Sequence, residues 1–358
     1  MTIHRRQQRA EDKAAISFNS KSASPKSKPS DKLARIACPQ WRGASKLLLS
    51  LVCIYTFAIA SGVDALSKSV SIETGLLVER WLSSGDFERR YLIYVPTTYR
   101  QGTAAPLVVV FHGGGGTSES IARTSRMHEI AEREGFITVY PNGLGRGGLS
   151  GRASWNTNSI APVGWAERTG VDDVGFVAAV IKDVSKQIKI DSARIYAAGM
   201  SKGGMMAYHA ACEMAGTFQA IAVVAGTLSS DECPTNAPVA ILHIHGTADE
   251  NVPLDGGTGA FSARRANWPA VDRGLLLWRD INRCKAEPTI VFEGEDTTCT
   301  SWTDCDKSAV VEVCLVDGGG HAWPGAEPAG WQIRRNIYVS QLFDASRFIW
   351  SFFTRHPQ

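Results

Sequence analysis

Short runs of consecutive apolar residues recur along the chain, separated by intervals long enough to hold a helix. A continuous apolar run of this length predicts a strand buried on both faces, as in a parallel sheet. Two earlier segments alternate apolar and polar residues, which predicts strands with one exposed face. Strands that alternate with helices indicate an α/β fold with a mostly parallel sheet. The buried runs are 105–111, 136–141, 193–199, 219–226 and 239–246, and the alternating segments are 75–81 and 89–96.

The intervals between these strands carry apolar residues at helical spacing. We predict one helix over residues 118–133 and another within 171–188, where the apolar residues share one stripe. Residues 339–353 close the chain as a third, amphipathic helix. Residues 144–169 are rich in glycine and tryptophan and predict a long loop, and loops of this length are often functional.

The first 65 residues differ in character from the rest. Residues 1–46 hold eleven Lys/Arg and three Asp/Glu and have the composition of a disordered segment, and residues 47–62 are apolar, with small residues near Ala65. This order is typical of a secretory signal, because a membrane span needs about 20 apolar residues; an uncleaved anchor is the alternative. We therefore expect a secreted protein, extracellular or periplasmic. No stable membrane span should remain after signal cleavage, and one domain should extend over residues 66–358.

Charge is distributed unevenly along the chain. Residues 1–46 carry a net +8 and the whole chain +3, which leaves −5 for the remainder. That remainder shows no basic stripe interleaved with aromatic residues, so we expect it not to bind nucleic acid.

Six cysteines follow the apolar stretch, and an even number in an exported chain predicts disulfides. The segments around Cys299 and Cys314 resemble the two strands of a hairpin, which would place these cysteines opposite each other. Free buried thiols are the alternative, and the absence of a C-x-x-C or His/Cys cluster argues against a metal site. The remaining pairs would be Cys284–Cys305 and Cys212–Cys233.

Residues 199–203 read Gly-Met-Ser-Lys-Gly, between a predicted strand and a predicted helix. The pattern G-x-S-x-G in this context is typical of a nucleophile elbow. Its glycines relieve crowding at the sharp turn, and the following helix N-terminus favours developing negative charge. Ser201 is therefore a candidate nucleophile; a glycine-rich turn with an idle serine is the alternative.

A serine nucleophile needs a base and an orienting acid, and in α/β-hydrolases these follow in the order Ser, Asp/Glu, His. Asp249 follows the buried run 239–246, and His321 lies in a glycine-rich loop after the last strand-like run. Both lie at strand ends, where open α/β sheets build their sites. We expect His112 to shape its loop and His243 to pack in the core. The rival acids are Glu250 and Asp255, and the rival bases are His112, His243 and His245.

The glycine-rich segment 112–116 follows the first buried strand, where esterases carry an H-G-G-G oxyanion loop. We assign the oxyanion donors to the backbone N–H groups of Gly114, with Gly115 as the alternative, and of Lys202. The side-chain charge of Lys202 should then be replaceable. Phosphate binding is a weak alternative, because no G-K-[ST] follows the glycines.

Taken together, these motifs resemble the secreted polyhydroxybutyrate depolymerase family of esterases, whose relatives include feruloyl and acetylxylan esterases of carbohydrate esterase family 1. The resemblance extends from about Gly75 to the C-terminus. It implies an α/β-hydrolase fold with Ser201 as nucleophile, Asp249 as acid and His321 as base. The motifs are HGGGGT, YPNG, SWN, GVDDVGF, GMSKGG, HGTAD-x-x-VP and GGGHAWPG.

The resemblance also assigns roles outside the triad. It implies that Trp155, Asn156 and Trp323 lie near the substrate cleft, and that Asp172 and Asp173 cap the following helix. The family's extracellular members often carry a linker and a polymer-binding domain. We expect neither here, because only a terminal helix is predicted after His321.

The leading hypothesis is thus a secreted serine esterase acting on an ester of a polymer or oligomer, with no metal or organic cofactor. Polyhydroxyalkanoate oligomers and the feruloyl or acetyl esters of plant cell walls are the competing substrates. A peptidase on the same scaffold is disfavoured, because the sequence before Pro106 is too short for a gating domain. A non-catalytic polymer-binding protein is the alternative from another class.

Overall fold

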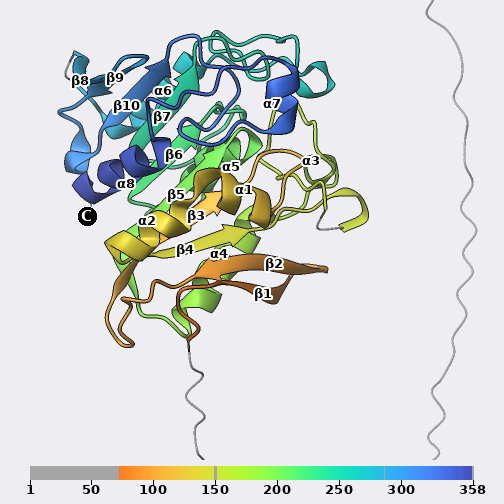
Figure 1. The fold of residues 1–358 in the computed structure, drawn as a ribbon, viewed down its shortest axis with the longest axis vertical. Helices are drawn as coiled ribbons and strands as arrows, with labels where there is room; N and C mark the ends of the chain where they lie inside the picture. The colour runs from red at the N-terminus through yellow and green to blue at the C-terminus, as the bar shows by residue number, and fades with distance from the viewer. Residues whose placement is uncertain (1–71, 149–150, 286, 357–358) are drawn as a thin grey trace, which may run out of the picture. The chain divides into compact units, whose positions relative to one another are not determined.

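A mixed sheet of ten strands forms the centre of residues 72–148, 151–285 and 287–356, which are the residues that the computed structural model describes (Figure 1). The chain divides into units 1–68 and 69–358, and only the second falls within this description. The predicted head and signal segment, with Cys38 and Cys53, lie outside it. The strands are β1 (Leu77–Ser84), β2 (Phe87–Tyr94), β3 (Ala105–Phe111), β4 (Ile137–Pro141), β5 (Ile190–Met200), β6 (Ala220–Val224), β7 (Ala240–Gly246), β8 (Thr289–Glu293), β9 (Thr297–Trp302) and β10 (Val311–Val316).

The order across the sheet is β1-β2-β4-β3-β5-β6-β7-β10-β9-β8. Strands β4, β3, β5, β6, β7 and β10 run parallel. An antiparallel hairpin joins each edge, β1–β2 beside β4 and β8–β9 beside β10. The predicted parallel centre and the two early alternating strands are therefore confirmed.

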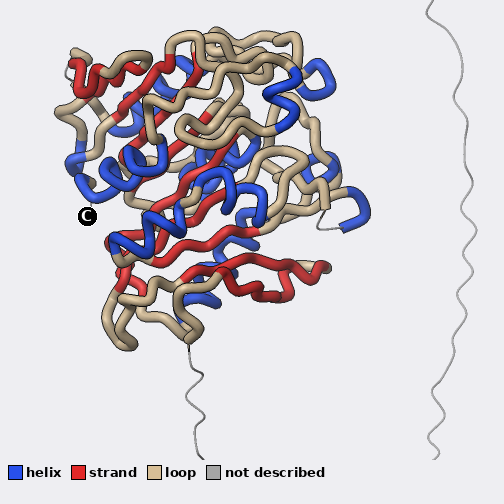
Figure 2. The backbone as a smooth tube through the Cα atoms, viewed as in Figure 1, coloured by secondary structure: helices blue, strands red, loops and turns tan. Residues whose placement is uncertain are grey.

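Helices cover both faces of the sheet (Figures 1 and 2). Leu107 and Val109 of β3 share a core with α4, α5 and α6, whereas Val108 and Val110 share one with α1, α2 and α8. Both faces of β3 are buried, which explains its continuous apolar sequence. The helices are α1 (Ser118–Ser125), α2 (Met127–Glu134), α3 (Trp165–Arg168), α4 (Asp173–Ser185), α5 (Lys202–Glu213), α6 (Val271–Asn282), α7 (Gly330–Arg334) and α8 (Ala345–Arg355).

The single helix predicted over residues 118–133 is wrong, because two helices occupy this segment. Arg126 lies between them with φ 47° and ψ 27°, a left-handed conformation that ends α1. Its N–H still donates to the Ala122 carbonyl at 2.9 Å, so a carbonyl group in the last turn of α1 keeps its hydrogen-bond partner.

The three predicted disulfides are present, linking Cys212 with Cys233, Cys284 with Cys305 and Cys299 with Cys314. Cys299 and Cys314 are directly opposed in the antiparallel register of β9 and β10, as the hairpin argument predicts. The outer strand β8 was not predicted, since its residues are mostly exposed. Among the described residues, no helix is long and apolar enough to cross a membrane.

Asp172 and Asp173 have different roles, so the prediction that both cap α4 is only half right. Asp172 accepts the Gly175 N–H at 2.7 Å and is the N-cap. Asp173 instead forms a buried ion pair with Arg89 of β2 at 2.6 Å and accepts the Asn156 N–H at 2.7 Å. Asp173 thereby connects the sheet to the long loop 144–169.

Candidate active site

Ser201 joins β5 to α5 in a strained conformation, with φ 57° and ψ −122°. A non-glycine residue in such a region costs about 1–3 kcal/mol and persists only where its neighbours enforce it. The Ser201 N–H donates to the Val224 carbonyl at 2.8 Å, and the Met205 N–H donates to the Ser201 carbonyl at 3.0 Å. Backbone hydrogen bonds on both sides therefore hold the turn.

The flanking glycines make this turn possible. A Cβ at Gly199 would lie 2.2 Å from the Gly203 carbonyl oxygen, and a Cβ at Gly203 would lie 2.2 Å from the Phe111 carbonyl oxygen. Neither position has room for a side chain, because both neighbours are backbone atoms. The glycine spacing thus lets β5, α5 and the end of β3 meet at Ser201.

Asp249 and His321 come together at the carboxyl ends of β7 and β10. His321 Nδ1 donates to Asp249 Oδ2 at 2.7 Å, and the other carboxylate oxygen accepts the N–H groups of Asn251 and Val252 at 2.8 and 2.9 Å. Burial favours a raised pKa for Asp249, but His321 and these hydrogen bonds outweigh it and lower the pKa. A stable carboxylate therefore orients the imidazole.

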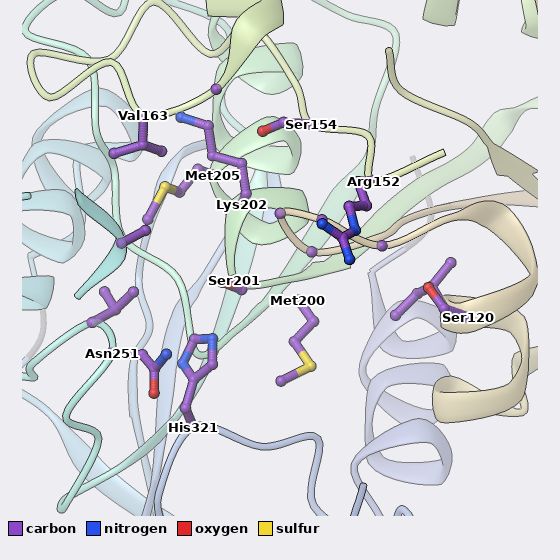
Figure 3. A pocket seen from close by; sticks show the side chains of 18 of the residues that line it. Ser120, Arg152, Ser154, Val163, Met200, Ser201, Lys202, Met205, Asn251 and His321 are labelled. Carbon is purple, nitrogen blue, oxygen red and sulfur yellow. The ribbon is translucent and has the colours of Figure 1, made fainter. Parts of the chain in front are cut away.

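Ser201 and His321 line the same cavity, and Figure 3 shows the His321 imidazole directed toward Ser201. Within the described residues, Ser201 Oγ and His321 make no direct hydrogen bond, and such bonds often tighten only when substrate is bound. The Gln332 side chain donates to the His321 carbonyl at 2.8 Å and holds this loop in place.

The other candidate histidines are fully buried. His112 Nε2 accepts the Gly143 N–H at 2.9 Å, and its Nδ1 lies 2.8 Å from the Gly113 carbonyl. Burial lowers the pKa of His112 to about 4, so it is neutral and shapes the loop, as predicted. His243 and His245 contact each other at 3.1 Å and line no part of the cavity, and His245 Nε2 lies 3.6 Å from Asp249 Oδ2.

In the glycine loop after β3, the N–H of Gly114 is better suited to donate to an oxyanion than the N–H of Gly115. The Gly115 N–H donates to the Ala153 carbonyl at 2.7 Å, so it is already occupied. A Cβ built on Gly114 would lie 3.6 Å from the Lys202 Cβ, which places Gly114 against the elbow. Lys202 is the first residue of α5, where the N–H has no partner within the helix.

The prediction that the Lys202 charge is replaceable did not anticipate the surroundings of this side chain. Lys202 is 3% exposed, and its Nζ donates to Thr157 Oγ1 at 2.8 Å and forms an ion pair with Glu167. Burial lowers the pKa of Lys202, and the Glu167 charge opposes this shift. Figure 3 shows the side chain running away from Ser201 toward the wall at Val163, whose N–H also donates to Glu167.

The cavity has a volume of about 1080 Å³. Trp155, Asn156 and Trp323, which the resemblance placed near the substrate cleft, do not line this cavity. Trp155 is fully buried and donates to the His112 carbonyl at 2.7 Å, and Trp323 donates to Ser346 at 2.9 Å. The Asn156 side chain donates to the Val171 carbonyl at 2.9 Å. Because the polar groups of these three side chains are hydrogen-bonded to other parts of the protein, we assign them structural roles.

Residues 89–255 match the family model described as "Esterase PHB depolymerase". This segment, slightly less than half of the chain, resembles the PHB depolymerase-like esterases. It is 28% identical over 249 residues to feruloyl esterase B of Piromyces equi, covering 68% of this chain and 44% of that protein. It is 30% identical over 240 residues to the putative esterase NocK of Nocardia uniformis subsp. tsuyamanensis, covering 62% of this chain and 66% of that protein.

The solved structures that this chain resembles include an acetyl xylan esterase from Aspergillus awamori. The TM-score is 0.51 at 17% identity, over 72% of this chain and 98% of that one. This likeness concerns the fold alone. It agrees with the α/β-hydrolase fold that the sheet topology and the Ser201 elbow indicate. The chain spans less than half the length of the Piromyces feruloyl esterase.

The walls of the cavity contain residues that sequence motifs did not single out. Trp165, Trp268 and Trp331 line the cavity. They come from α3, from the segment after β7 and from α7, so no sequence spacing relates them to Ser201. Only the tertiary fold brings them to the same cavity.

Proposed function

We propose that this chain is an exported serine esterase that hydrolyses carboxylic esters of a polymer or oligomer through an acyl-enzyme. The observation that carries the proposal is the 2.7 Å bond between His321 and Asp249 beside a serine in elbow geometry, with His321 and Ser201 lining one cavity. The match of residues 89–255 to the family model "Esterase PHB depolymerase" supports this chemistry.

Each residue has a defined role in the proposed reaction. Ser201 Oγ attacks the ester carbonyl while His321 Nε2 takes its proton, and Asp249 keeps the proton on Nδ1 and stabilises the imidazolium. The N–H groups of Gly114 and Lys202 donate to the oxyanion. His321 then protonates the leaving alcohol. Water attacks the acyl-enzyme by the same route and releases the acid and Ser201.

Export is supported by the three disulfides, which persist in oxidising compartments. The basic and apolar N-terminal segments agree with it. Extracellular and periplasmic sites are both compatible with these features.

A feruloyl or acetylxylan esterase is the second candidate function. It is favoured by the names of the relatives and by the tryptophans of the cavity wall, whose rings suit an aromatic acyl group or a sugar. Parallel assays on hydroxybutyrate oligomers, methyl ferulate and acetylated xylan separate the candidates by their relative kcat/KM values.

The test of the leading proposal is the Ser201→Ala variant assayed on p-nitrophenyl butyrate. We expect kcat to fall by at least about 10⁴-fold while the unfolding midpoint stays close to that of the parent. The control is Ser159→Ala, a loop serine that does not line the cavity. A Ser201→Ala variant that retains a tenth of the parent activity would exclude the serine mechanism.

A further inference from the structure

Six arginines line the cavity that holds Ser201 and His321, and no Asp or Glu is among its described lining residues. This composition is not that of the molecule as a whole. Residues 47–358 contain 27 of the 38 Lys/Arg and 32 of the 35 Asp/Glu, so the body of the protein is mildly acidic. The six arginines are Arg123, Arg146, Arg152, Arg168, Arg264 and Arg335.

The cavity arginines also differ from the others in their partners. Among the described residues, eight of the fourteen arginines outside the cavity form an ion pair with a carboxylate, and none of the six in the cavity does. The remaining lining cation, Lys202, is neutralised by Glu167. The cavity therefore presents exposed guanidinium groups whose charge the protein does not compensate.

These arginines reach the cavity from separate parts of the chain. Arg123 comes from α1, Arg168 from α3 and Arg335 follows α7, while the others lie in the segments between β4 and α3 and between β7 and α6. Figure 3 shows the Arg152 guanidinium among the side chains that line the pocket around Ser201. One Arg335 contact fixes its position, since its guanidinium lies 4.3 Å from the Phe261 ring centre. Charges of one sign around a cleft attract ligands of the opposite sign.

We infer that the preferred substrate of this site is an anionic ester, one that carries a free carboxylate group in addition to the scissile ester bond. The planar guanidinium group matches a carboxylate and binds it through two parallel hydrogen bonds. Arginines on several walls accommodate carboxylates at different distances from the scissile ester, as in oligomers of different length. A neutral polymer surface would gain nothing from these charges. The inference rests on the proposed esterase function and specifies its substrate.

The test compares two esters that differ by one charge and one methyl group, 4-nitrophenyl hydrogen adipate and its methyl ester. At an ionic strength of about 10 mM we expect kcat/KM to be about tenfold higher for the anionic ester. This preference should decline toward unity at about 0.5 M salt, because the Debye length falls from about 30 Å to a few ångströms. Hydroxybutyrate trimer as free acid and as methyl ester should show the same ranking.

The chain offers a matched control for the residues. Arg264→Gln/Arg335→Gln removes two cavity charges, whereas Arg265→Gln/Arg334→Gln removes two adjacent charges that do not line the cavity. We expect the preference for the anionic ester to fall about fivefold in the first double variant and to stay within about 1.5-fold of the parent in the second.

The outcomes separate this inference from the proposed function. If both adipate esters are hydrolysed equally well at low salt, or if both double variants change the preference alike, the anionic-substrate inference is overturned and the esterase function stands. If neither ester nor p-nitrophenyl butyrate is hydrolysed, the esterase function fails and the inference fails with it.

Discussion

The two halves of the catalytic centre are held in place by different means. On one side, Ser201 is positioned by backbone alone, through a strained turn, two glycines and main-chain hydrogen bonds. On the other side, Asp249 and His321 are positioned by side-chain hydrogen bonds between two loops. The first arrangement is local in sequence and the second depends on tertiary contacts. This difference predicts how each half responds to substitution.

The largest effect is expected where a side-chain bond alone sets the geometry. Asp249→Asn should lower kcat by about 10⁴-fold, because the amide favours the wrong imidazole tautomer at His321. Steady-state hydrolysis of p-nitrophenyl butyrate measures this change. Glu250→Gln is the control and should keep at least about half of the parent kcat. A comparable loss in Glu250→Gln would transfer the role of acid to that residue.

The second effect concerns the ion pair between Lys202 and Glu167, which links α5 to α3. Lys202→Met should destabilise the fold by about 3–5 kcal/mol, because it leaves Glu167 buried and uncompensated. Urea unfolding measures the loss. The double variant Lys202→Met/Glu167→Gln should recover most of it, since the buried charge is then absent. If the double variant is no more stable than Lys202→Met, the ion pair does not explain the effect.

The smallest effect is the dependence of stability on pH. Burial lowers the pKa values of His112 and His209 to about 4, below the ordinary histidine value of about 6.5. The unfolded chain therefore takes up protons between pH 6.5 and 4 that the folded chain does not. Stability is complete above about pH 6.5 and falls by about 2 kcal/mol per histidine by pH 5.

Urea unfolding at pH 7.5, 6 and 5 checks this slope. His209→Gln removes one of the imidazoles whose pKa burial lowers to about 4, so its slope between pH 6 and 5 should be smaller by about one proton. A His209→Gln slope equal to that of the parent would show that this histidine does not titrate as described.

The comparison of the two halves also explains what could be predicted from the sequence. Ser201, the central strands and the cysteine hairpin were predictable, because glycine spacing, apolar runs and strand register are local patterns. Asp249 and His321 could be placed only by their order and by their positions at strand ends. The hydrogen bond between them is known only from the three-dimensional structure.

The cavity wall was the least predictable part. Trp155 and Trp323 lie in recognisable motifs, but their indole N–H groups are used inside the protein. The tryptophans and arginines that do line the cavity lie in loops and short helices without a distinctive local pattern. The Lys202–Glu167 pair joins residues 35 positions apart, and a sequence pattern does not reveal a contact of this kind.

The central claim is that Ser201 is a nucleophile activated by His321. Its most direct test is peptide mapping by mass spectrometry after labelling the intact protein with a fluorophosphonate. We expect a single adduct on Ser201, no adduct in Ser201→Ala, and labelling slowed by at least about 10²-fold in His321→Ala. An adduct on another residue, or an equal labelling rate in His321→Ala, would contradict it.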